Sequence, residues 1–143
     1  MILGAIGFFI VLNPSWGEPE SAIADSFPNI ISVNPNSSGW AGLECSTGLT
    51  EKNEQARIVC SDSDLSITLT DFGSQEVRDS FLDGIERKHW KVDDCEVATM
   101  KLGTDAENRK DKVAVAPVNY KQNFGIILEG SEALDRFRTL PFC

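Results

Sequence analysis

A strand followed by an amphipathic helix is the clearest hydrophobic pattern in the chain, in the stretch LSITLTDFGSQEVRDSFLDGIERKHW. In the run LSITLT, which begins at Leu65, apolar and polar residues alternate, and this predicts a half-buried strand. The apolar residues Val77, Phe81 and Ile85 then fall four apart, which predicts a helix with one buried face. Ser74 is a suitable N-cap for this helix. We expect the rest of the chain to pack onto this unit.

The remaining pattern predicts further strands and a second helix. Short apolar runs bounded by polar loops predict strands at residues 40–47, 55–61, 89–101, 113–118 and 124–128. The segment FGIILEGSEALDRFRTL repeats the order strand, turn and helix, with Ser131 as the N-cap. The prediction is an α+β fold in which an antiparallel sheet of about five to six strands carries both helices on one face, stapled by two disulfides.

The N-terminal residues 1–24 are predicted to be a signal peptide. Residues 2–12, ILGAIGFFIVL, are an unbroken run of apolar residues and glycine. A helix of this length, at ~1.5 Å per residue, is too short to cross a ~30 Å hydrocarbon layer, but it has the length of a signal-peptide core. Cleavage after Ala24 fits the A-x-A rule and is preferred, and cleavage after Gly17 is the alternative. No Lys or Arg precedes Lys52, which counts against a signal peptide. Retention as an uncleaved anchor is the competing hypothesis.

The rest of the chain is predicted to form a linker and a single domain. Residues 25–39, DSFPNIISVNPNSSG, are rich in Asn, Ser and Pro, which is typical of an extended arm or linker. Residues 40–143 then make one α+β domain, because a chain of 143 residues with 41% apolar residues can bury one modest core.

All four cysteines lie beyond the predicted signal peptide, at Cys45, Cys60, Cys95 and Cys143. An even number without a C-x-x-C pair indicates disulfides in an oxidising compartment rather than a zinc or redox site. Of the three pairings, we favour Cys45–Cys60 and Cys95–Cys143. The alternative is free thiols, one of which would be a nucleophile.

The net charge of −9 and the sequence pI of about 4.5 limit the kinds of partner that can be expected. A nucleic acid or an anionic membrane surface would be repelled by this field, so neither is an expected partner. A membrane is an expected partner only if the N-terminal segment is retained.

No arrangement of residues predicts a catalytic, cofactor-binding or metal site. His89 is the only histidine, and its position at the expected helix end favours a capping role. Asp62 and Asp64 have the spacing of the first two ligands of a calcium loop, but the rest of that motif is missing, so an Asx turn is the better interpretation.

The residues expected to form a ligand or partner surface are Trp40, His89, Trp90 and Tyr120. The sequence favours a small exported protein, periplasmic or secreted, that is not an enzyme and acts by binding another protein. The alternatives are a membrane-tethered accessory subunit of a larger complex, which keeps its N-terminal segment, and a small hydrolase that uses His89.

Overall fold

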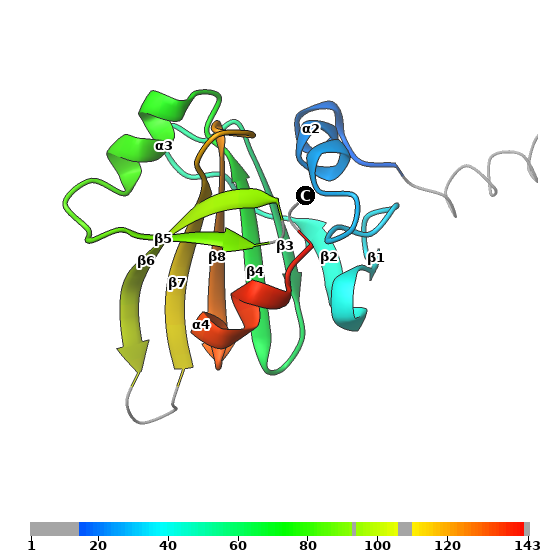
Figure 1. Cartoon of the computed structure of the whole chain (residues 1–143). Helices are drawn as coiled ribbons and strands as arrows, with labels where there is room; N and C mark the ends of the chain where they lie inside the picture. The colour runs from blue at the N-terminus through cyan, green and yellow to red at the C-terminus, as the bar shows by residue number, and fades with distance from the viewer. Residues whose placement is uncertain (1–14, 93, 106–109, 142–143) are drawn as a thin grey trace, which may run out of the picture.

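The protein folds around one antiparallel sheet of eight strands (Figure 1). The computed structural model describes residues 15–92, 94–105 and 110–141. The strand order across the sheet is β1-β2-β3-β4-β8-β7-β6-β5. In chain order the strands and α-helices are α2 (Glu18–Ser26), β1 (Ser37–Ser38), β2 (Glu44–Thr47), β3 (Ala56–Ser61), β4 (Leu65–Asp71), α3 (Gln75–Phe81), β5 (Lys88–Val92), β6 (Cys95–Asp105), β7 (Lys110–Pro117), β8 (Phe124–Ser131) and α4 (Ala133–Arg136), with 3-10 turns η1 (Trp40–Gly42) and η2 (Phe137–Thr139).

The chain runs twice through a meander of four strands that ends in a helix. β1 to β4 lead into α3, and β5 to β8 lead into α4. The two meanders join in the middle of the sheet, where the last strand of each, β4 and β8, pair with Leu69 opposite Ile126. The repetition of strand, turn and helix in the sequence therefore corresponds to two similar halves of one sheet.

The predicted fold class was wrong in the number of strands and in the placement of the helices. The sheet has eight strands, not five or six, and α2 is a third helix among the described residues. The other two helices lie on opposite faces. Leu82, directly after α3, packs with Met100 on one face, whereas Phe137, directly after α4, belongs to the larger core on the other. Both faces of the sheet are apolar because β6 and β7 bury side chains that point to either face. A pattern of alternating apolar and polar residues along one strand predicts only one buried face.

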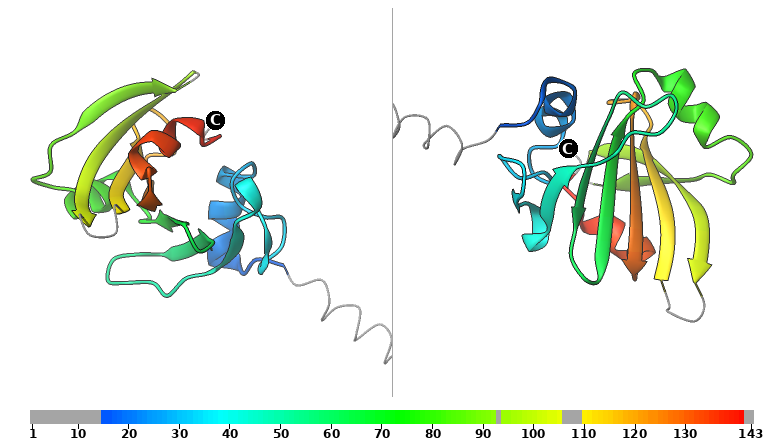
Figure 2. Two further views of the ribbon diagram at one scale, coloured as in Figure 1. Left: turned by 90° about the horizontal axis from the view of Figure 1, so that it is seen from below. Right: turned by 180° about the vertical axis from the view of Figure 1, so that it is seen from behind.

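The larger core lies between the sheet, α2 and α4. Figure 2, left, shows the sheet bent around these two helices, with α3 outside the bend. The core includes Ile67, Leu69, Val115 and Ile126 from the central strands, all at most 1% exposed. The sheet thus encloses two helices on its concave side.

The N-terminal part of the domain packs into this core. Ile23 in α2 and Phe27 directly after it are fully buried, and the ring centroids of Phe27 and Phe124 lie 5.5 Å apart. Ile30, in the segment expected to be an arm, is also fully buried. Ala24, the preferred cleavage position, lies inside α2. Among the described residues, no helix is long and apolar enough to cross a membrane.

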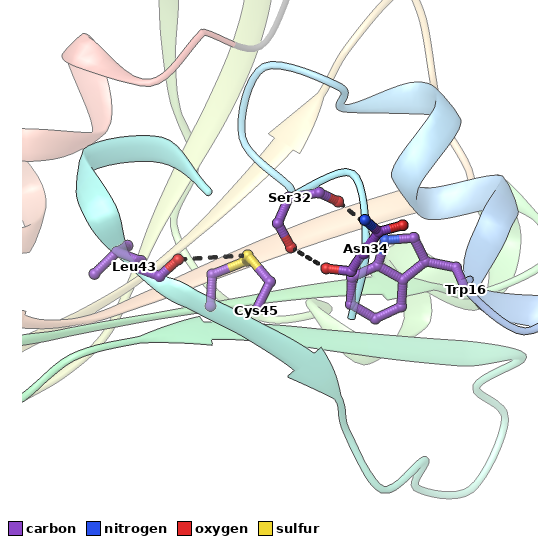
Figure 3. The surroundings of a disulfide bond; sticks show 6 residues. Trp16, Ser32, Asn34, Leu43 and Cys45 are labelled. Atoms are coloured by element: carbon purple, nitrogen blue, oxygen red, sulfur yellow. Dashed lines mark hydrogen bonds between the residues drawn. A yellow bond between two sulfur atoms is a disulfide. The ribbon is translucent and has the colours of Figure 1, made fainter. Parts of the chain in front are cut away.

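One of the two predicted disulfides has both of its cysteines among the described residues. It joins Cys45 and Cys60, which are directly opposed on β2 and β3, as the sequence predicted (Figure 3). The second predicted pair, Cys95–Cys143, includes a residue outside the described ranges. Beside the disulfide, the indole Nε1 of Trp16 donates a hydrogen bond of 3.0 Å to the carbonyl oxygen of Ser32. This bond ties the chain before α2 to the loop that follows the helix.

A buried arginine fixes α3 to the sheet. Arg78 is only 2% exposed, and its Nη1 donates to the carbonyl oxygens of Pro117 at 2.7 Å and Phe124 at 3.2 Å. Its Nε and Nη2 both lie 3.2 Å from the carboxylate of Asp79. Burial lowers the pKa of Arg78, and the charge of Asp79 opposes this shift. Gly125 makes room for the Phe72 ring, which precedes α3, because a Cβ there would lie 2.9 Å from it.

Candidate functional site

The structure separates the four residues predicted to form a surface. Trp40 lies in η1, next to the β1–β2 edge of the sheet, whereas His89 and Trp90 lie on β5 at the opposite edge. Tyr120 lies in the loop between β7 and β8. Of the four, only Trp90 lines the groove described next.

Trp90 points to the concave side of the sheet because of the alternation along β5. It pairs with Val97 of β6, which belongs to the larger core, so its neighbours His89 and Lys91 project from the other face. Its ring packs edge-on against Phe137, with the centroids 5.4 Å apart. The indole is therefore held by the core on one side and only partly buried.

A groove of about 470 Å³ lies between β5, β6 and α4, and Trp90 forms part of its wall. Its apolar lining comes from Ile85, Trp90 and Leu134. Its charged lining comes from three basic residues, Lys88, Lys101 and Arg138, and two acidic residues, Glu86 and Asp135. The basic side chains outnumber the acidic ones, although the chain as a whole carries a net charge of −9.

Two of these cations rest on the Trp90 ring. The Nζ of Lys88 lies 4.5 Å and the Cζ of Arg138 lies 4.3 Å from the ring centroid. Such contacts are worth ~0.5–1 kcal/mol at exposed sites, and they hold the cations in place without neutralising them. Among the ion pairs of the described residues, none involves Lys88, Lys101 or Arg138. The groove thus presents positive charge that is available to an anionic group.

The orientation of the indole is fixed by a chain of hydrogen bonds. Trp90 Nε1 donates to Thr99 Oγ1 at 2.8 Å, and Thr99 Oγ1 donates to the carbonyl oxygen of Lys88 at 3.4 Å. Thr99 is only 4% exposed, so this bond is largely shielded from water. The ring therefore serves as a preformed apolar surface rather than as a donor to a ligand.

The strand that carries Trp90 is an edge of the sheet. In the described part of the chain, β5 pairs with β6 and has no strand on its other side. Alternate N–H and C=O groups of an edge strand point outward, where they can pair with an added strand.

The other candidate residues show no comparable site. His89 is exposed on β5 opposite Ala98, not at the end of a helix, and none of the hydrogen bonds found among the described residues joins it to a carboxylate or hydroxyl. Asp62 forms the expected Asx turn, since its Oδ1 accepts from the N–H groups of Leu65 and Asp64 at 2.8 Å each. These two bonds lower the pKa of Asp62. Within the described ranges, no group of three or more His, Cys, Asp or Glu residues could hold a metal ion.

The sequence could have identified Trp90 and Lys88 but not the residues opposite them. Lys101 and Arg138 reach the groove only through the pairing of β5 with β6 and the return of α4 across the sheet. The fold and the groove define a small one-sheet domain with a cationic, aromatic groove at one edge. No protein-family model, no curated protein and no solved structure matches this chain.

Proposed function

We propose that the protein is an exported, non-enzymatic binding protein that recognises an acidic segment of a partner protein at the Trp90 groove. The observation that carries this proposal is the pair of cations, Lys88 and Arg138, held 4.5 Å and 4.3 Å from the Trp90 ring without an ion pair among the described residues. A carboxylate bound there would gain a charge-assisted hydrogen bond beside an apolar surface.

The position of the groove favours an extended peptide over a small anion. The groove runs along an edge strand, so a segment could add to β5 through its main chain while its side chains enter the groove. Acidic side chains would then contact Lys88, Lys101 and Arg138. Glu86 and Asp135 limit the attraction for a single anion and favour a ligand that also supplies apolar contacts.

Export is supported by the disulfide and by the apolar run at residues 2–12. The two cleavage sites differ in what they would remove from the fold. Cleavage after Ala24 would cut α2 and remove the fully buried Ile23. Cleavage after Gly17 would leave α2 whole and, of the described core residues, remove only the partly buried Trp16. We therefore propose Gly17 as the cleavage position. Retention of the segment as a membrane tether remains the alternative, and it leaves the groove unchanged.

The test is titration of the protein with a synthetic ten-residue peptide that alternates Glu with Val, by calorimetry at low and moderate salt. The expected result is saturable binding that weakens as salt rises, because screened charges attract less. The double variant Lys88→Gln/Arg138→Gln is expected to bind at least about tenfold more weakly, which corresponds to ~1.4 kcal/mol.

The matched control is Lys91→Gln. Lys91 is exposed on the same strand but projects from the other face, so its loss changes the net charge without changing the groove. A peptide that alternates Gln with Val serves as the uncharged ligand. If Lys91→Gln weakened binding as much as the double variant Lys88→Gln/Arg138→Gln, or if both peptides bound equally, the groove would not be the recognition site.

A further inference from the structure

The loop between β2 and β3 presents an almost completely exposed leucine. Leu49 is 92% exposed, the highest value among the large exposed apolar residues of the described chain. The loop covers residues 48–55, and Figure 2, left, shows it in teal, standing clear of the rest of the ribbon. An isolated exposed leucine is ordinary on a protein surface. What distinguishes Leu49 is the set of interactions that hold its loop.

Two backbone anchors bracket Leu49 and Thr50. On one side, the N–H of Gly48 donates to the carbonyl oxygen of Arg57 at 2.8 Å. On the other side, the N–H of Glu51 donates to Glu54 Oε1 at 3.1 Å, and the N–H of Glu54 donates to the carbonyl oxygen of Glu51 at 3.2 Å. Leu49 and Thr50 themselves belong to no helix, strand or turn and are exposed.

An ion pair braces the loop from inside. Arg57 Nε and Nη2 donate to the two carboxylate oxygens of Glu54 at 2.9 Å and 2.6 Å, a bidentate arrangement. The Glu54 side chain is only 3% exposed, so this pair is shielded from water. Gly48 allows Arg57 to lie across the loop, because a Cβ at Gly48 would be 2.8 Å from Arg57 Cγ.

The base of the loop is covalently closed. The Cys45–Cys60 disulfide joins the two strands from which the loop springs, with a sequence separation of 15. The N–H of Gln55 also donates to the carbonyl oxygen of Asp71 on the neighbouring strand β4 at 2.8 Å. The exposed leucine is therefore carried on a loop that has little freedom left to lose when it binds.

We propose that this loop inhibits serine endopeptidases, with Leu49 entering the apolar specificity pocket and the Leu49–Thr50 peptide bond lying at the reactive serine. Such enzymes bind an extended segment and select it by the side chain before the susceptible bond. A rigid exposed segment meets this need with a small entropic penalty, which is how preorganised inhibitors bind tightly with little change of shape. The proposal depends on the proposed function only in requiring export, so that the disulfide forms, and it is independent of the Trp90 groove.

The same braces explain why the loop would inhibit rather than be consumed. Hydrolysis requires the new amino group of Thr50 to move away so that water can replace it. The bonds between Glu51 and Glu54 hold the chain directly after Thr50, and the disulfide joins the two strands that flank the loop, so this movement would be restricted. Cleavage would therefore be slow relative to an unstructured peptide of the same sequence.

The experiment measures inhibition of chymotrypsin and subtilisin, which accept apolar side chains, and of trypsin, which accepts Lys and Arg. The unaltered protein is expected to inhibit at least one of the first two enzymes and not trypsin. Leu49→Lys is expected to lose at least about 100-fold in that inhibition and to gain inhibition of trypsin. Val33→Lys is the matched control, because Val33 is 87% exposed elsewhere on the surface, and it is expected to change nothing.

Further variants separate this proposal from the others. Arg57→Met leaves Leu49 in place but removes the internal brace, so it is expected to convert the inhibitor into a substrate that is cleaved after Leu49. Lys88→Gln/Arg138→Gln, which tests the Trp90 groove, is expected to inhibit as well as the unaltered protein. The proposal is overturned if the unaltered protein inhibits neither chymotrypsin nor subtilisin, or if it is cleaved after Leu49 as fast as the free peptide.

Discussion

Replacement of Arg78 by Met is expected to be strongly destabilising. Met preserves most of the apolar stem but leaves the carbonyl oxygens of Pro117 and Phe124 without the Nη1 donor that now bonds to both. Hydrogen bonds to a charged group contribute ~1.5–3 kcal/mol each, and desolvation of the guanidinium offsets part of that gain. We therefore expect a loss of about 3 kcal/mol in the free energy of unfolding. Arg78→Lys, with one ammonium group, is expected to lose about half as much.

The assay is urea unfolding followed by circular dichroism. With a slope of about 2 kcal/mol per molar urea, a loss of 3 kcal/mol lowers the midpoint by ~1.5 M. Arg87→Met is the matched control, because Arg87 is partly exposed and lies 3.7 Å from the same carboxylate of Asp79. A surface pair of this kind is worth ~0–1 kcal/mol. Equal midpoints for Arg78→Met and Arg87→Met would refute the role assigned to the buried arginine.

Two further predictions concern a buried hydroxyl and the N-terminal helix. The Tyr120 hydroxyl is buried with no hydrogen-bond partner among the described residues. Tyr120→Phe is therefore expected to leave the free energy of unfolding unchanged or raise it by up to ~1 kcal/mol. A loss of more than ~1 kcal/mol, measured by urea unfolding, would contradict this. Burial raises the pKa of Tyr120 to about 12. Between about pH 10 and 12 the unfolded state therefore loses the phenolic proton while the folded state keeps it. The free energy of unfolding should fall by up to ~2 kcal/mol over this range. Tyr120 is the only tyrosine, so its ultraviolet titration measures this pKa, and a midpoint near 10 would disprove the shift. A protein that begins after Ala24 should unfold about 10 °C below one that begins after Gly17, because it lacks the buried Ile23; equal midpoints would show that this part of α2 is dispensable.

Local patterns in the sequence were sufficient to predict the centre of the fold. The alternation from Leu65 corresponds to β4, and Ser74 caps α3 by accepting a hydrogen bond of 3.3 Å from the N–H of Val77. The Cys45–Cys60 pair is confirmed because it depends only on two adjacent strands of a hairpin. These features are decided by residues close together in the chain.

The length and the face of α3 could not be predicted in the same way. The four-residue spacing of Val77, Phe81 and Ile85 predicted one long apolar face, but the helix ends at Phe81, whose side chain is 48% exposed. The side chain that α3 buries is Arg78, because the ends of β7 and β8 offer two carbonyl acceptors there. Those acceptors lie 39 and 46 residues away in sequence, so no local pattern shows them.

The charge of the chain is unevenly divided, and this bears on both proposed surfaces. Residues 1–83 contain 12 acidic and three basic side chains, whereas residues 84–143 contain ten of each. The Trp90 groove is built from the second part and the Leu49 loop from the first. An acidic segment would therefore be repelled more by the part of the molecule built from residues 1–83 than by the part that forms the groove at β5. Because the loop springs from β2 and β3 and the groove lies at β5, one molecule could hold an acidic segment and a protease at the same time.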